Sequence, residues 1–170
     1  MKWTTIVFIL LVTSFANGQE PLSPPARTSV TINGKKLTIA YSSPFIRGRK
    51  IMGGLVPYGQ SWRTGADNAT TFQTDADLDL GGLKVPKGIY TIYTLPGATE
   101  WQLIINKQTG QWGTEYNQRQ DLGRVKMNLA QTPALVDSFK IELLSTGGGN
   151  KGLLKMTWER TEVSVPFVVQ

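Results

Sequence analysis

The 170-residue sequence contains no cysteine and no histidine. Without a thiol the chain forms no disulfide and offers no thiolate nucleophile, and without an imidazole it lacks the usual activator of a serine nucleophile. Both absences also exclude a zinc site built from histidine and cysteine. Phosphate-loop and GxGxxG patterns are missing too, which disfavours nucleotide and dinucleotide enzymes. The chemistry that remains depends on arginine, aromatic rings and carboxylates.

Long apolar runs are also scarce, and the one present lies near the N-terminus. Lys2, the apolar run 6–12 and the small residues around Ala16-Asn17-Gly18 have the layout of a secretory signal peptide over residues 1–18. The run is shorter than the roughly 20 apolar residues that a membrane-spanning helix needs. We therefore expect cleavage before Gln19, no membrane insertion afterwards, and a periplasmic or secreted protein, a compartment that suits an exported chain without disulfides.

Composition predicts one globular domain after a short spacer. Hydrophobic residues make up 40% of the chain, and 18 glycines and 9 prolines indicate many turns. Residues 19–27, QEPLSPPAR, contain three prolines and are typical of an extended spacer, which leaves 28–170 as the domain. The net charge of +6 permits an anionic partner, but without a dense basic run we expect no nucleic acid.

Apolar residues alternate with polar ones along most of the chain. Val30 and Ile32 precede the turn Asn33-Gly34, and the alternation resumes after it, which predicts a β-hairpin. No stretch of 12 residues keeps a helical period. The sequence therefore predicts an all-β fold, an antiparallel β-sandwich or jelly roll with long loops and little helix. Further strands are expected within 37–41, 69–74, 78–80, 89–95, 101–105, 125–129, 139–143, 154–158 and 163–167.

The stretch 41–71 gathers glycines, arginines and aromatic rings, and the polar segment 108–121 carries two further rings. Guanidinium groups bind carboxylate or phosphate in a bidentate manner, and an indole stacks on sugars and cations. These properties predict a site for an anionic small molecule or a glycan. The alternative is structural, with Trp62 plugging the end of the sandwich and the arginines paired with acids. The candidate ligand-binding residues are Arg47, Arg49, Trp62, Arg63, Asn68 and Trp112.

Carboxylates supply the second hypothesis, a hydrolase or lyase in which Asp67 acts as acid or base near Arg63. Glycoside hydrolysis needs two carboxylates that converge, and sequence spacing does not show convergence. Asp75, Asp77 and Asp79 alternate as a calcium ladder would, but solvated side chains are the commoner explanation, so we predict no metal and no other cofactor. We favour a non-catalytic binding domain for a small ligand or a cell-envelope partner over an enzyme, and a structural interaction module is the third hypothesis.

The stretch 41–71 also carries the runs SSP, GRKI, GGLVPYG and WRTGA. With these runs, the sequence from about Ser23 to Leu144 resembles a bacterial family known as domain of unknown function 2911. The resemblance implies an exported and mostly β domain, in agreement with the residue patterns. It implies no reaction, substrate or cofactor, so the function has to be argued from the residues themselves.

Overall fold

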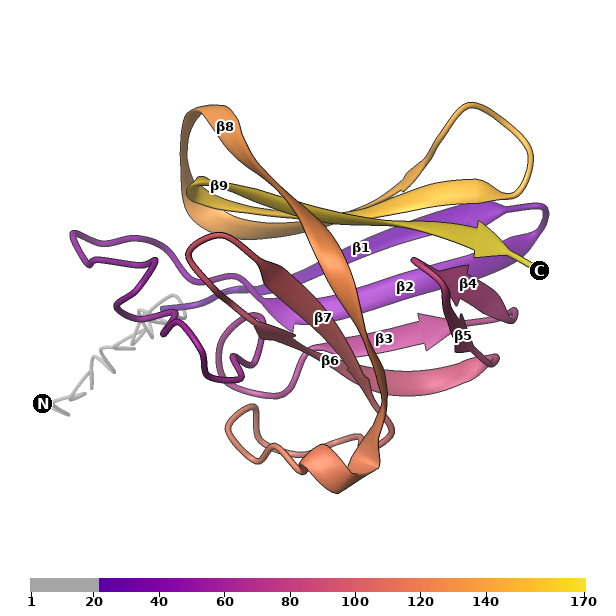
Figure 1. The fold of residues 1–170 in the computed structure, drawn as a ribbon, viewed down its shortest axis with the longest axis horizontal. Coiled ribbons are helices and arrows are strands. Elements are labelled where there is room, and N and C mark those ends of the chain that lie inside the picture. The colour runs from indigo at the N-terminus through magenta and orange to yellow at the C-terminus, as the bar shows by residue number, and fades with distance from the viewer. Residues whose placement is uncertain (1–21) are drawn as a thin grey trace, which may run out of the picture.

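The computed structural model describes residues 22–170, so the expected signal peptide and the first residues of the spacer lie outside it. The described chain forms one antiparallel sheet in the order β1-β2-β3-β6-β7-β8-β9-β4-β5 (Figure 1). This confirms the all-β prediction. Residues Gln118–Gln120 form the 3-10 turn η1. Within residues 22–170, no helix is long and apolar enough to cross a membrane. The strands are β1 (Pro25–Ile32), β2 (Lys35–Ser42), β3 (Thr71–Thr74), β4 (Leu78–Leu80), β5 (Leu83–Val85), β6 (Gly88–Leu95), β7 (Trp101–Asn106), β8 (Asp121–Ser145) and β9 (Lys151–Val169).

The first predicted hairpin is confirmed, but its first strand begins earlier than expected. Asn33 and Gly34 both have positive φ angles, 50° and 72°, as the tight turn between β1 and β2 requires. Pro25 pairs with Ser42, so β1 begins inside the predicted spacer 19–27. Proline is tolerated as the first residue of an edge strand, because its missing N–H leaves no gap in the ladder. The last three residues of the predicted spacer 19–27 therefore belong to β1.

The C-terminal half differs more from the prediction. Four short strands were expected there, whereas β8 and β9 are two long ones that pair with each other from Asn128 to Ser145. Before Asn128, β8 pairs with β7 instead. The register of β8 and β9 shifts around Val136, and Glu159 has a φ of 53°. A bulge of this kind bends a strand without ending it. The interruptions of the apolar alternation in this half of the sequence therefore correspond to bends within β8 and β9 and not to turns between separate strands.

The β8–β9 hairpin lies over β1 and β2 (Figure 1), and the core between them continues through buried residues of β3, β4, β5, β6 and β7. Hydroxyl groups of β1 and β2 also accept hydrogen bonds from the backbone of β8. The Ile141 N–H donates to the Tyr41 hydroxyl at 3.0 Å, and the Leu143 N–H donates to the Thr28 hydroxyl at 3.2 Å. A single continuous sheet thus folds over on itself, and its apolar side chains face one another in one core.

Candidate functional site

The loop that leaves β2 crosses one end of the sheet, and side chains hold it there. The Ser43 hydroxyl donates to the backbone carbonyl of Phe139 at 2.7 Å. Further along, the Glu159 carboxylate accepts the N–H groups of Ile51 and Met52, each at 3.4 Å. Glu159 belongs to the bulge of β9, so the positive φ there coincides with a contact to the loop. The loop is therefore tied to the hairpin at two places.

A compact turn follows, and buried hydroxyl groups fix it. The Thr70 hydroxyl donates to the carbonyl of Thr64 at 2.8 Å, and the hydroxyl of Thr64 lies 3.2 Å from that of Thr94. Thr64 and Asp67 both have a φ of 57°, in the left-handed region that residues other than glycine rarely adopt. Such backbone conformations persist only where the surrounding structure enforces them. The turn therefore presents Asp67 in a defined position.

The segment 108–121, the second loop singled out from the sequence, packs against this turn. The Ala69 N–H donates to the Gln111 carbonyl at 3.2 Å, and the Gly113 N–H donates to the Asp67 carbonyl at 2.9 Å. A Cβ atom at position 113 would lie 2.6 Å from both the Asp67 carbonyl oxygen and Cδ of Arg63. Only glycine permits this approach without a shift. The two loops therefore form one continuous wall.

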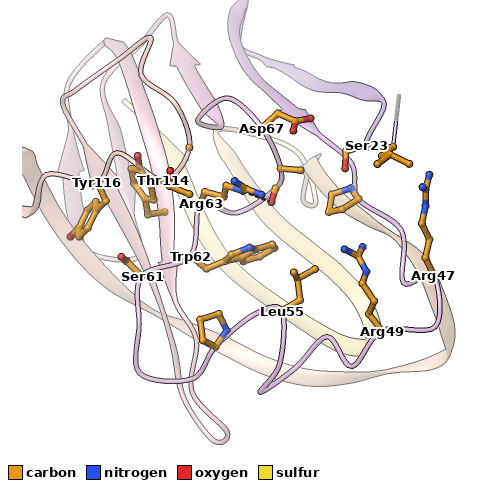
Figure 2. Close-up of a pocket in the computed structure, with 17 residues that line it drawn as sticks. Ser23, Arg47, Arg49, Leu55, Ser61, Trp62, Arg63, Asp67, Thr114 and Tyr116 are labelled. Carbon is orange, nitrogen blue, oxygen red and sulfur yellow. Dashed lines mark hydrogen bonds between the residues drawn. The ribbon is translucent and has the colours of Figure 1, made fainter. Parts of the chain in front are cut away.

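A cleft of about 590 Å³ opens between the loops (Figure 2), within the range of about 300 to 1,000 Å³ that is usual for small-molecule sites. Four of the six candidate residues line it: Arg47, Arg49, Trp62 and Arg63. Asn68 and Trp112 do not belong to the lining. They form an isolated antiparallel bridge with each other, and both are exposed.

The arginines of the cleft are held by backbone carbonyls and a ring. Arg49 donates to the carbonyls of Phe45 at 2.6 Å and Ile46 at 3.2 Å. The guanidinium of Arg47 lies 5.7 Å from the centre of the Phe45 ring, a cation–π distance. Arg63 donates to a carbonyl two residues further on. Within residues 22–170 no salt bridge involves these arginines, so the acid partners expected in the structural alternative are not found there.

Trp62 packs at the end of the core and also lines the cleft. Only 7% of the residue is exposed, and its ring stacks on Trp158 at 5.9 Å and meets Phe139 edge-on at 5.0 Å. Its backbone exchanges two hydrogen bonds with Thr94 of β6. The ring therefore closes the end of the core, as the structural alternative predicted, and its remaining surface contributes to the cleft.

Tyr116 lies at the end of the cleft farthest from Arg47 (Figure 2). The rings of Tyr93 and Tyr116 lie 4.8 Å apart, centre to centre. The hydroxyl of Tyr116 donates to the Asp121 carboxylate at 2.7 Å and accepts from Arg124 at 2.9 Å. Tyr93 belongs to β6 and is almost fully buried. In the sequence, β6 carries apolar residues on both of its faces. This pattern was the signal that both faces of β6 are covered, one by the core and the other by a loop.

Burial, followed by the hydrogen bond and the negative charge of Asp121, raises the pKa of Tyr116 from 10.0 to about 12. A folded-state pKa above the unfolded value stabilises the fold below about pH 10, and this contribution is lost as the pH rises towards 12. We therefore expect the free energy of unfolding to fall over this interval, and to fall less steeply in Tyr116→Phe. Denaturant unfolding at a series of alkaline pH values measures the two slopes. Equal slopes would contradict this assignment.

The three alternating aspartates have local partners in two cases. The carboxylate of Asp77 accepts the Lys87 N–H at 2.7 Å. That of Asp79 accepts the Gly82 N–H at 2.8 Å and pairs with the Lys84 ammonium at 2.9 Å. These contacts fasten the turn of the small β4–β5 hairpin and the start of β6. They lie outside the cleft.

Of three comparisons with known proteins, one confirms the resemblance noted in the sequence. Neither the comparison with curated proteins nor that with solved structures finds a significant match. One family model, described as a protein of unknown function (DUF2911), matches residues 23–167 and so covers nearly all of the described chain. The match extends beyond Leu144 into β9. The chain therefore belongs to the DUF2911 family.

Proposed function

We propose that this protein is an exported, non-catalytic binding domain whose cleft holds a small anionic or saccharide-like ligand, either free or as part of a cell-envelope partner. One observation carries the proposal: Arg47, Arg49 and Arg63 line the same cleft, and none of them has a carboxylate partner within residues 22–170. Positive charges gathered in a cleft raise the local concentration of anions, and guanidinium groups bind carboxylate or phosphate in a fixed geometry.

The composition of the cleft wall favours binding over hydrolysis. Among residues 22–170, Asp67 is the one carboxylate that lines the cleft. A glycoside hydrolase needs two carboxyl groups on opposite sides of the scissile bond, about 5 to 10 Å apart. The wall also contains apolar side chains, including Leu55 and Pro57, beside its charged groups. Apolar surface with a few convergent polar groups is the usual make-up of a ligand site.

Thermal unfolding in the presence of chosen probes tests this proposal. A ligand that binds the folded state stabilises it by mass action, by about 2.7 kcal/mol at one hundred times its Kd. We expect anionic probes such as citrate, phosphate and D-glucuronate to raise the melting temperature of the wild-type protein. The double variant Arg49→Ala/Arg63→Ala should lose this response.

Lys151→Ala is the matched control, because Lys151 is the exposed first residue of β9 and does not line the cleft. The turn between β8 and β9 lies at the opposite end of the molecule from the loop that follows β2 (Figure 1). This variant should respond to the probes as the wild type does. The proposal fails if no anionic probe shifts the wild-type melting temperature, or if the double variant responds as strongly as Lys151→Ala.

A further inference from the structure

Asp67 brings a negative charge into the wall of the cleft, and this charge restricts the class of ligand. Asp67 is exposed at the cleft wall, next to the turn that carries Arg63. Its backbone is fixed by the hydrogen bond from Gly113 and by its left-handed conformation. None of the salt bridges within residues 22–170 involves Asp67. The backbone at Asp67 is therefore fixed, and its carboxylate has no salt-bridge partner within these residues and is available to a ligand.

An ionised carboxylate only accepts hydrogen bonds, so it needs a donor on the ligand. Asp67 repels an anion without donors, which weakens the binding of such a ligand but does not prevent it, because three guanidinium groups line the same cleft. The donor is either an ammonium or a hydroxyl group. Among the described residues 22–170, three guanidinium groups against one carboxylate leave two positive charges in excess in the cleft, which opposes an ammonium and tolerates a neutral hydroxyl. The charges together fit a ligand that carries an acid group and hydroxyl groups.

The charged groups are also separated along the cleft. Figure 2 shows Arg47 and Arg49 towards one end, Tyr116 and Ser61 towards the other, and Arg63 between them. An acid group at the first end leaves the body of the ligand beside Arg63 and Asp67. A guanidinium donates to a hydroxyl oxygen while a carboxylate accepts the hydroxyl proton. This combination satisfies neighbouring hydroxyl groups of a sugar ring from both sides.

We propose that the cleft binds an acidic sugar, a polyhydroxylated ring with a carboxylate, with the carboxylate on Arg47 and Arg49 and neighbouring ring hydroxyls between Arg63 and Asp67. This inference rests on the proposed anion-binding function and adds the requirement for hydroxyl groups. It assigns Asp67 as the residue that distinguishes an acidic sugar from an acid without hydroxyls. Free sugar acids and acidic polysaccharides share this chemistry.

Three probes of similar size test the requirement by calorimetric titration: D-glucuronate, cyclohexanecarboxylate and D-glucose. They present, respectively, a ring acid with hydroxyls, a ring acid without hydroxyls, and a ring with hydroxyls but no acid. We expect D-glucuronate to bind the wild type at least about tenfold more tightly than either of the other two, the loss that follows from missing hydrogen bonds to charged groups. Titration with oligogalacturonates of increasing length then shows whether a free acid or a polymer is preferred, and either preference supports the proposal.

Asp67→Asn isolates the residue. Asparagine tolerates the left-handed backbone and keeps the shape of the side chain while removing its charge. We expect the variant to bind D-glucuronate about tenfold more weakly and cyclohexanecarboxylate at least as well as the wild type does. Asp75→Asn, an exposed aspartate outside the cleft, should change neither affinity.

Two results overturn the inference in different ways. If cyclohexanecarboxylate binds as tightly as D-glucuronate and Asp67→Asn weakens neither, hydroxyl recognition is wrong while anion binding by the arginines stands. If neither acid binds the wild type and the anions citrate and phosphate also fail, the proposed function itself is wrong and the inference falls with it.

Discussion

Replacing Trp62 with alanine is expected to lower the free energy of unfolding by about 3 to 5 kcal/mol. The residue is 7% exposed, stacks on Trp158 and meets Phe139 edge-on, so the substitution removes a large ring from the end of the core. The neighbouring side chains belong to different strands and cannot all close the gap. Denaturant unfolding measures the loss through the transition midpoint.

Trp112→Ala is the matched control for this substitution. The sequence placed both tryptophans in the candidate site, but Trp112 is 47% exposed and lies outside the cleft lining. Its bridge to Asn68 uses backbone groups, which alanine keeps. We expect a change of no more than about 0.5 kcal/mol. Comparable losses for the two variants would contradict the distinction between a ring that closes the core and a ring on the surface.

Asp121→Ala is expected to lower the free energy of unfolding by about 2 to 3 kcal/mol. The Asp121 carboxylate is 12% exposed and accepts hydrogen bonds from Tyr116, Arg124 and Asn106. Its removal leaves the guanidinium and the fully buried Asn106 amide short of an acceptor. The Asn106 amide keeps its bond to the Asn117 carbonyl and the guanidinium keeps its bond to the Tyr116 hydroxyl, so the expected cost comes from the lost hydrogen bonds to a charged acceptor.

An exposed ion pair provides the comparison for Asp121. Glu100 pairs with Lys126 at 2.8 Å, but both side chains are largely open to solvent. Glu100→Ala should therefore cost less than about 1 kcal/mol. Unfolding of both variants at neutral pH separates the two cases. A loss for Asp121→Ala no larger than that for Glu100→Ala would contradict the role of Asp121 as the acceptor that holds the Tyr116 end of the cleft.

Local patterns were sufficient to predict the first hairpin of the fold. Asn33-Gly34 specifies a tight turn through two residues with positive φ, and the alternation on either side specifies its strands. The long β8 and β9 were not predictable in the same way. Their bends around Val136 and Glu159 are maintained by pairing across the sheet, and such long-range pairing leaves no local trace except an interruption that resembles a turn.

The candidate site was also predictable only in part. Arg47, Arg49, Trp62 and Arg63 lie in one contiguous stretch, and the structure places all of them on the cleft. Asn68 and Trp112 were reasonable by residue type, but which side of a loop a residue occupies depends on the tertiary contacts of that loop. The contact between Gly113 and the turn at Asp67 joins segments nearly 50 residues apart. Because no periodic pattern in the sequence reports such a contact, it could not be predicted.

The measurement that tests the central claim most directly is a calorimetric titration of D-glucuronate into the wild-type protein and into Arg49→Ala/Arg63→Ala. The claim is that three arginines without a carboxylate partner among residues 22–170 make the cleft an anion site. We expect saturable binding to the wild type and an affinity about one hundredfold lower in the double variant, from two losses of roughly tenfold each. Equal affinity in the two proteins, or no binding to the wild type by this or any other anionic probe, would contradict the claim.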